Sequence, residues 1–170
     1  HDGTDSSISN NTGDLKIIQN ADDKDIIFQS DDGSGGTTPY LTISGSGGVI
    51  RLEDDRRLTI GSGNDLQLKH SSGASSITNF TGAFNIVQEM VDGDIIFSSD
   101  DGSGGVETYF FLDGSEGVVN FPDNKRLTFG TGRDLFLYHD GTNATFKNYV
   151  GDIVIQNEAN DKDIRFKSDD

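Results

Sequence analysis

Residues 57–73 read RLTIGSGNDLQLKHSSG, and residues 126–142 read RLTFGTGRDLFLYHDGT. The two stretches are equivalent parts of a repeat, because His1, His70 and His139 open segments that align without gaps at a constant spacing (70 − 1 = 139 − 70). Self-similarity at a fixed period is the sequence signature of a repeat architecture. The third segment stops in mid-repeat, which predicts that the natural array is longer. We divide the chain into two full repeats and one partial repeat: residues 1–69, 70–138 and 139–170.

Within a repeat, apolar and polar residues alternate over short stretches, which is typical of strands with one buried face. Six pairs predict the inward side chains of the first repeat: Leu15/Ile17, Ile26/Phe28, Leu41/Ile43, Ile50/Leu52, Leu58/Ile60 and Leu66/Leu68. Clusters of Gly, Asn, Asp and Ser between the pairs supply the positive φ angles and capped turns that strand reversals need. No window keeps a helical pattern, so the sequence predicts an all-β fold with about seven short strands per repeat.

Composition excludes several classes of function. Asp and Glu outnumber Lys and Arg by 29 to 13, and the net charge of −16 argues against nucleic acid as a partner, because such a surface repels phosphates. The chain has no cysteine, which excludes a disulfide framework and a thiolate metal site. It also has no apolar run near the roughly 20 residues that a membrane helix needs, so we expect no membrane insertion by this segment.

The predicted strands are too narrow to form a core by themselves. Two inward side chains per strand bury too little apolar surface to offset the entropy of ordering the loops around them. Identical chains around a common axis could pool these stripes and cover their strand edges. We therefore expect an elongated repeat fibre, a parallel homotrimer built as a triple β-helix or β-prism-like shaft. A single-chain β-solenoid is the alternative, although the unequal spacing of successive pairs disfavours coils of constant length.

One phrase carries a family resemblance. Gly130-Thr131-Gly132-Arg133-Asp134-Leu135-Phe136-Leu137-Tyr138-His139-Asp140-Gly141-Thr142 resembles the Gly-x-Gly-x-Asp-Leu-x-Leu-x-His-Asp-Gly-Thr phrase that recurs in tail-fibre proteins of marine and cyanobacterial bacteriophages. The resemblance extends over the whole chain, although His70 is followed by Ser71-Ser72-Gly73 instead of Asp-Gly-Thr. It implies an elongated, β-structured, usually trimeric fibre whose host recognition is concentrated at a distal tip.

Two sets of residues are candidate metal ligands. His70 and His139 continue the inward alternation, so copies of each could meet near a trimer axis and bind a divalent metal, or each ring could simply hydrogen-bond a turn. Oxygen-rich turns could bind Ca²⁺ weakly, or could be ordinary Asp-Gly turn chemistry on a solvated face. The residues of these turns are Asp31, Asp32, Asp100 and Asp101.

Aromatic residues are the candidate ligand contacts. Phe136, Tyr138 and Tyr149 could stack on sugar rings of a host cell-surface glycan, or could fill the core and pair across strands. We find no nucleophile with a partnered base, no phosphate loop and no distinctive carboxylate pair, so we expect no enzyme and no obligatory cofactor. The sequence thus favours a structural shaft segment of a phage tail fibre in the virion. The alternatives are a glycan-binding adhesin module and a filament of the bacterial cell surface.

Overall fold

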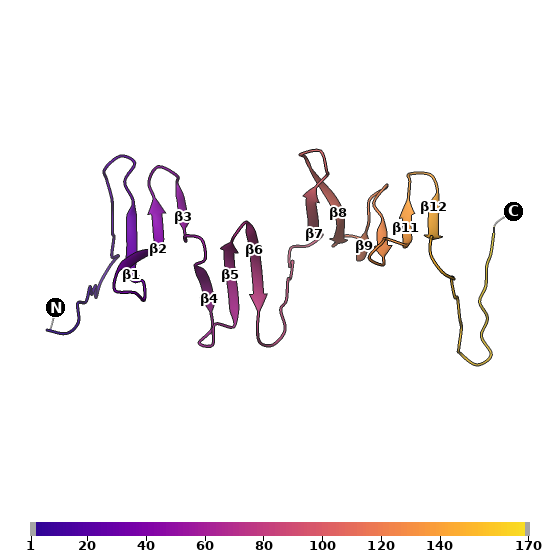
Figure 1. Cartoon of the computed structure of the whole chain (residues 1–170), viewed down its shortest axis with the longest axis horizontal. Helices are drawn as coiled ribbons and strands as arrows, with labels where there is room; N and C mark the ends of the chain where they lie inside the picture. Colours follow the sequence, from indigo (N-terminus) through magenta and orange to yellow (C-terminus); the bar gives the residue numbers. More distant parts are fainter. Residues whose placement is uncertain (1–2, 169–170) are drawn as a thin grey trace. The chain divides into compact units, whose positions relative to one another are not determined.

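A computed structural model describes residues 3–168 of the chain. In this range twelve strands form four three-stranded antiparallel sheets, none of them closed, and the all-β prediction is confirmed (Figure 1). The first two sheets comprise β1 (Ile26–Asp31), β2 (Thr37–Ser44) and β3 (Val49–Arg51), then β4 (Arg57–Ile60), β5 (Leu66–Ser71) and β6 (Ala74–Asn79). The other two comprise β7 (Ile95–Asp100), β8 (Val106–Asp113) and β9 (Val118–Asn120), then β10 (Leu127–Phe129), β11 (Leu135–His139) and β12 (Ala144–Asn148).

Each sheet is a meander whose strands pair in sequence order. In the first sheet Ile43 lies opposite both Ile26 and Ile50, and in the second sheet Leu68 lies opposite both Leu58 and Ile77. Residues directly opposite one another in a ladder point to the same face. The register therefore places the predicted inward residues of each sheet on one face, which we call the apolar face.

One predicted strand does not form. The alternating pair Leu15/Ile17 lies in a segment without strand pairing, and both side chains are exposed. The counterparts in the next two repeats, Phe84/Ile86 and Ile153/Ile155, behave alike. A strand exists only with a hydrogen-bonded neighbour, and no described segment pairs with these stretches. Six strands therefore form in each period of the repeat, β1–β6 and then β7–β12.

The chain divides into two compact units, His1–Asn85 and Ile86–Asp170. The repeat boundary drawn between Lys69 and His70 falls inside β5. A period fixes the spacing of equivalent elements but leaves the starting point of a repeat arbitrary. Each structural unit contains two sheets, β1–β3 and β4–β6 in the first unit and β7–β9 and β10–β12 in the second. A displacement by one repeat relates β1–β6 to β7–β12.

A glycine turn connects the first sheet, and likewise the third sheet, to the segment that precedes it. The backbone N–H of Gly45 donates to Asp25 Oδ1 at 2.9 Å, and that of Gly114 donates to Asp94 Oδ1 at 3.0 Å. A Cβ at Gly45 would collide with the carbonyl oxygen of Lys24, and one at Gly114 would collide with the carbonyl oxygen of Gly93. Both positions therefore need glycine for space.

Very little of the molecule is buried. Among the described residues Phe136 is the only buried hydrophobic side chain, and Thr42 and Ser44 are the buried polar ones. The apolar faces lie open instead: Ile50 is 71% exposed and Ile77 is 62% exposed. The described part of the chain contains no helix capable of crossing a membrane.

Candidate functional site

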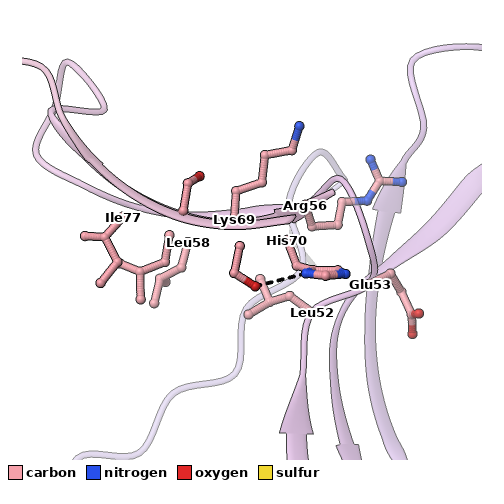
Figure 2. A pocket seen from close by; sticks show the side chains of 10 residues that line it. Leu52, Glu53, Arg56, Leu58, Lys69, His70 and Ile77 are labelled. Atoms are coloured by element: carbon pink, nitrogen blue, oxygen red, sulfur yellow. Dashed lines mark hydrogen bonds between the residues drawn. The ribbon is translucent and has the colours of Figure 1, made fainter. Parts of the chain in front are cut away.

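A groove of about 560 Å³ lies on the apolar face of the second sheet. Leu58, Leu68 and Ile77 form one cross-strand row that lines its floor. Leu52, which follows β3, also lines it, so the apolar face of the first sheet continues into that of the second. Figure 2 shows Leu58, Ile77 and Leu52 on one side of the sheet, while Lys69 points to the other side.

A second groove of about 510 Å³ occupies the same position in the next repeat. Its lining residues correspond to those of the first groove displaced by one repeat, except that Glu53 has no counterpart in the lining: Phe121, Lys125, Leu127, Leu137, Tyr138, His139, Ala144, Thr145 and Phe146. Leu52 and Ile77 are replaced by phenylalanine, and neither groove has an aspartate in its lining. The groove is thus a recurring feature of the repeat, and it is apolar in both copies.

The two candidate histidines line these grooves and are hydrogen-bonded locally. His70 Nδ1 lies 3.0 Å from the hydroxyl of Ser75 (Figure 2). His139 Nδ1 lies 2.9 Å from Asp123 Oδ1 and 3.1 Å from the backbone nitrogen of Gly141. In residues 3–168 no three His, Cys, Asp or Glu side chains converge in a way that could hold a metal ion. Metal binding by either histidine stays a prediction.

The candidate acidic turns cap their own backbone. Asp32 Oδ1 accepts hydrogen bonds from the Ser34 N–H at 2.7 Å, the Ser34 hydroxyl at 2.8 Å and the Gly36 N–H at 3.0 Å. Asp101 repeats this arrangement with Ser103 and Gly105. The adjacent Asp31 and Asp100 each accept from a glycine N–H two residues ahead. One oxygen in each loop is therefore engaged by three donors, and calcium binding by these loops stays a prediction.

The loop hydrogen bonds predict an unusual titration. The Ser34 hydroxyl, followed by the Ser34 and Gly36 N–H groups, lowers the pKa of Asp32 below its ordinary 3.8. Because hydrogen bonds favour the charged form, the loop gains stability above pH 3.8 that is lost as pH falls through the depressed pKa. Carbon-13 NMR of the carboxyl groups should show that Ser34→Ala raises the pKa of Asp32 and leaves Asp101 unchanged. An unaltered Asp32 titration would contradict this arrangement.

Phe136 and Tyr138 alternate along β11 with the apolar-face residues Leu135 and Leu137, and Tyr138 also borders the groove. Phe136 is buried, with Tyr138 at 5.5 Å and Tyr149 at 5.7 Å between ring centroids. The guanidinium of Arg126 lies 4.9 Å from the Phe136 centroid and 5.0 Å from that of Tyr138, and Lys147 lies 4.4 Å from that of Tyr149. The structure thus brings all three together, as a cluster covered by two cations of the same chain. Stacking on sugars stays a prediction.

The Gly-x-Gly-x-Asp phrase has a packing role. A Cβ on Gly63 would lie 2.9 Å from the carboxylate of Asp65, and one on Gly132 would lie 2.6 Å from that of Asp134. The backbone carbonyls of Asp65 and Asp134 accept from the N–H groups of Phe80 and Tyr149, each at 2.8 Å. The glycines therefore leave room for the two carboxylates, while the backbone carbonyls of the same aspartates pair with the residues that follow β6 and β12.

Sequence reasoning missed the cations that connect the sheets within a unit. Arg56 donates to the Thr38 hydroxyl at 3.2 Å and lies 4.9 Å from the Tyr40 ring centroid. Lys125 replaces it in the second unit, pairing with Glu107 and lying 5.5 Å from the Tyr109 centroid. A cation recurs at this position of the repeat, as Arg56 and Lys125, and this recurrence could have indicated the contact from the sequence.

Comparison of the chain with protein-family models, curated proteins and solved structures finds no significant match.

Proposed function

We propose that this chain is a structural shaft segment of a bacteriophage tail fibre or a closely related appendage, in which three parallel copies enclose a shared apolar interior. The observation that carries the proposal is that the predicted inward residues that lie in strands share one face of each sheet and yet are exposed or only half-buried in the single chain. A large exposed apolar surface that repeats along a chain marks an interface. Other copies of the same chain present the same surface at the same spacing.

Surface area supports this reading. The chain exposes 14265 Å², whereas a compact monomer of 18.3 kDa exposes about 8,100 Å². Even two separate compact domains of half that mass would expose only about 9,800 Å² together, and the remaining excess of about 4,000 Å² is several times the roughly 800 Å² that each partner buries in a standard interface. A closed assembly of copies would remove much of it from water.

Strand pairing favours a trimer over the single-chain solenoid. Every sheet in the described range is an antiparallel meander of consecutive strands. A solenoid stacks its coils so that each buries its neighbour's inward side chains. Here the sheets of a unit are joined through Arg56 or Lys125, and their apolar faces stay open. Companion chains offer a way to close these faces.

The distribution of charge is compatible with copies that carry a net charge of −16 each. Asp31, Asp32, Asp100 and Asp101 lie at strand ends or in turns, and Glu53 is the only acidic residue in the lining of either groove. Apart from Glu53, acidic side chains are therefore absent from the groove linings, while the acidic surface opposes lateral aggregation of finished shafts.

The proposed role is mechanical and places the protein in the virion. The number of repeats sets the length of a shaft that holds a receptor-binding tip away from the particle. The glycan-binding module, with location on a bacterial surface, stays the alternative. The cations over Phe136, Tyr138 and Tyr149 already occupy ring faces that a sugar would use.

A change in repeat number tests the mechanical role. Inserting one and then two additional copies of residues 70–138 should lengthen the particles seen by electron microscopy by the same increment each time. The reason is that each repeat brings its own sheets and its own share of the interior. Particles whose longest dimension does not increase with repeat number would contradict a shaft.

A further inference from the structure

The apolar faces of the two structural units differ in one systematic way. The first unit carries a single phenylalanine on this face, Phe28, and the second unit carries five. Four aliphatic residues of the first face correspond to phenylalanine in the second: Leu41 to Phe110, Leu52 to Phe121, Ile60 to Phe129, and Ile77 to Phe146. The first face therefore carries one aromatic side chain, whereas the second carries five beside aliphatic residues such as Leu112 and Leu137; we call them the aliphatic face and the aromatic face.

Three of these five phenylalanines form a stack, which we call the array. Phe97 and Phe110 stack with centroids 4.4 Å apart and planes 10° apart. Phe121 continues the stack, 5.6 Å from Phe110 at 22°, and it also lines the groove that contains Phe146. The array thus extends from the third sheet to the edge of the groove on the fourth. Phe97 is 39% exposed and Phe146 is 51% exposed, so this face lacks a cover within the described chain.

We infer that the apolar face of each chain docks on the same face of parallel copies with zero offset, so that each repeat meets the same repeat of the other copies. The five phenylalanines of the second unit, which we call the aromatic set, select this offset. The inference rests on the proposed trimeric shaft and names the contact surface within it. A repetitive chain needs a feature that distinguishes its repeats, because copies shifted by one whole repeat keep the same alternation of apolar and polar residues in every strand.

The physical basis is the volume of the side chains that meet. With zero offset, copies around a cyclic axis bring aromatic faces against aromatic faces and aliphatic faces against aliphatic ones. A shift by one repeat, or an antiparallel arrangement, brings an aromatic face against an aliphatic one. Cores tolerate changes that conserve total volume, but cavities and overpacking are costly. Size matching therefore penalises the wrong offset.

Chemical cross-linking tests the offset directly, because the chain has no cysteine of its own. In a His70→Cys/His139→Cys chain, a bismaleimide should join residue 70 to residue 70 and residue 139 to residue 139 of other copies. Mass spectrometry of the linked peptides identifies the pairs, and native mass spectrometry of the same sample gives the number of chains. Links between 70 and 139 in a trimer would overturn the zero offset and leave the shaft intact. A monomer would remove both proposals.

Mixing experiments test the role of the aromatic set. A swapped chain carries Leu41→Phe, Leu52→Phe, Ile60→Phe and Ile77→Phe together with Phe110→Leu, Phe121→Leu, Phe129→Ile and Phe146→Ile. Refolded together, it and the wild type should form separate trimers, whereas isotope-labelled and unlabelled wild type should mix in about a 1:3:3:1 ratio. Statistical mixing of the swapped chain with the wild type would overturn selection by size. If the swapped chain does not assemble, a chain with only Ile77→Phe and Phe146→Ile is tested in the same way.

Discussion

Replacement of Ile77 by Asp should abolish the assembly and release single chains. Ile77 lies in the cross-strand row with Leu58 and Leu68 on the floor of the first groove. In the proposed trimer each copy would bring an unpaired carboxylate into an apolar interior. The effective penalty for removing an ion from water is several kcal/mol, so we expect a loss of about 3 kcal/mol or more per chain. Sedimentation equilibrium of wild type and variant measures the effect.

Ser76→Asp is the matched control, one residue earlier on the same strand. Ser76 is exposed, alternates with Ile77 along β6 and lies opposite Lys69 in the ladder, and both Ser76 and Lys69 border the groove. A carboxylate there gains a cationic neighbour, and cross-strand pairs of opposite charge are mildly favourable. We expect this variant to assemble like the wild type. Equal behaviour of the two variants would show that Ile77 is not in the interior of an assembly.

Gly114→Ala should produce the second large effect, a loss of about 2–3 kcal/mol per chain from overpacking. Its φ lies outside the left-handed region, so the reason is space: the added methyl group would collide with the carbonyl oxygen of Gly93. The same shift would break the hydrogen bond from the Gly114 N–H to Asp94. Thermal unfolding at a fixed protein concentration measures the loss. Gly45→Ala should repeat it in the first unit.

Gly117→Asn serves as the control in the same turn. Gly117 has a φ of 65°, which asparagine tolerates, and a Cβ there would meet nothing within 4 Å. We expect this variant to unfold within about 1 kcal/mol of the wild type. If Gly114→Ala were as mild, the close approach of the turn to the segment before β7 would not matter for stability.

The sheets could be predicted from the sequence because alternation and turn chemistry act locally. The pairs Ile26/Phe28, Leu41/Ile43 and Leu58/Ile60 all lie on the faces that the period-2 pattern predicts. The exception is Leu15/Ile17, whose pattern is equally good but which lacks a strand partner. Alternation reports which face of a segment is apolar, whereas a strand also requires a neighbouring backbone.

The candidate site was only partly predictable. The presence of His70 and His139 beside the apolar stripe followed from spacing, and both line the grooves. The contact of Arg126 with the rings of Phe136 and Tyr138 could not be predicted from spacing, because it depends on the register of β10 against β11. Long cationic side chains reach across strands, so their partners emerge only once the ladder is known.

The mass of the folded chain in native solution tests the central claim most directly. Native mass spectrometry, supported by circular dichroism to show that the sheets are intact, should give three times the 18.3 kDa of one chain. A single chain that keeps its β-structure at 18.3 kDa would contradict the account, since its apolar faces would then be stable without companion copies.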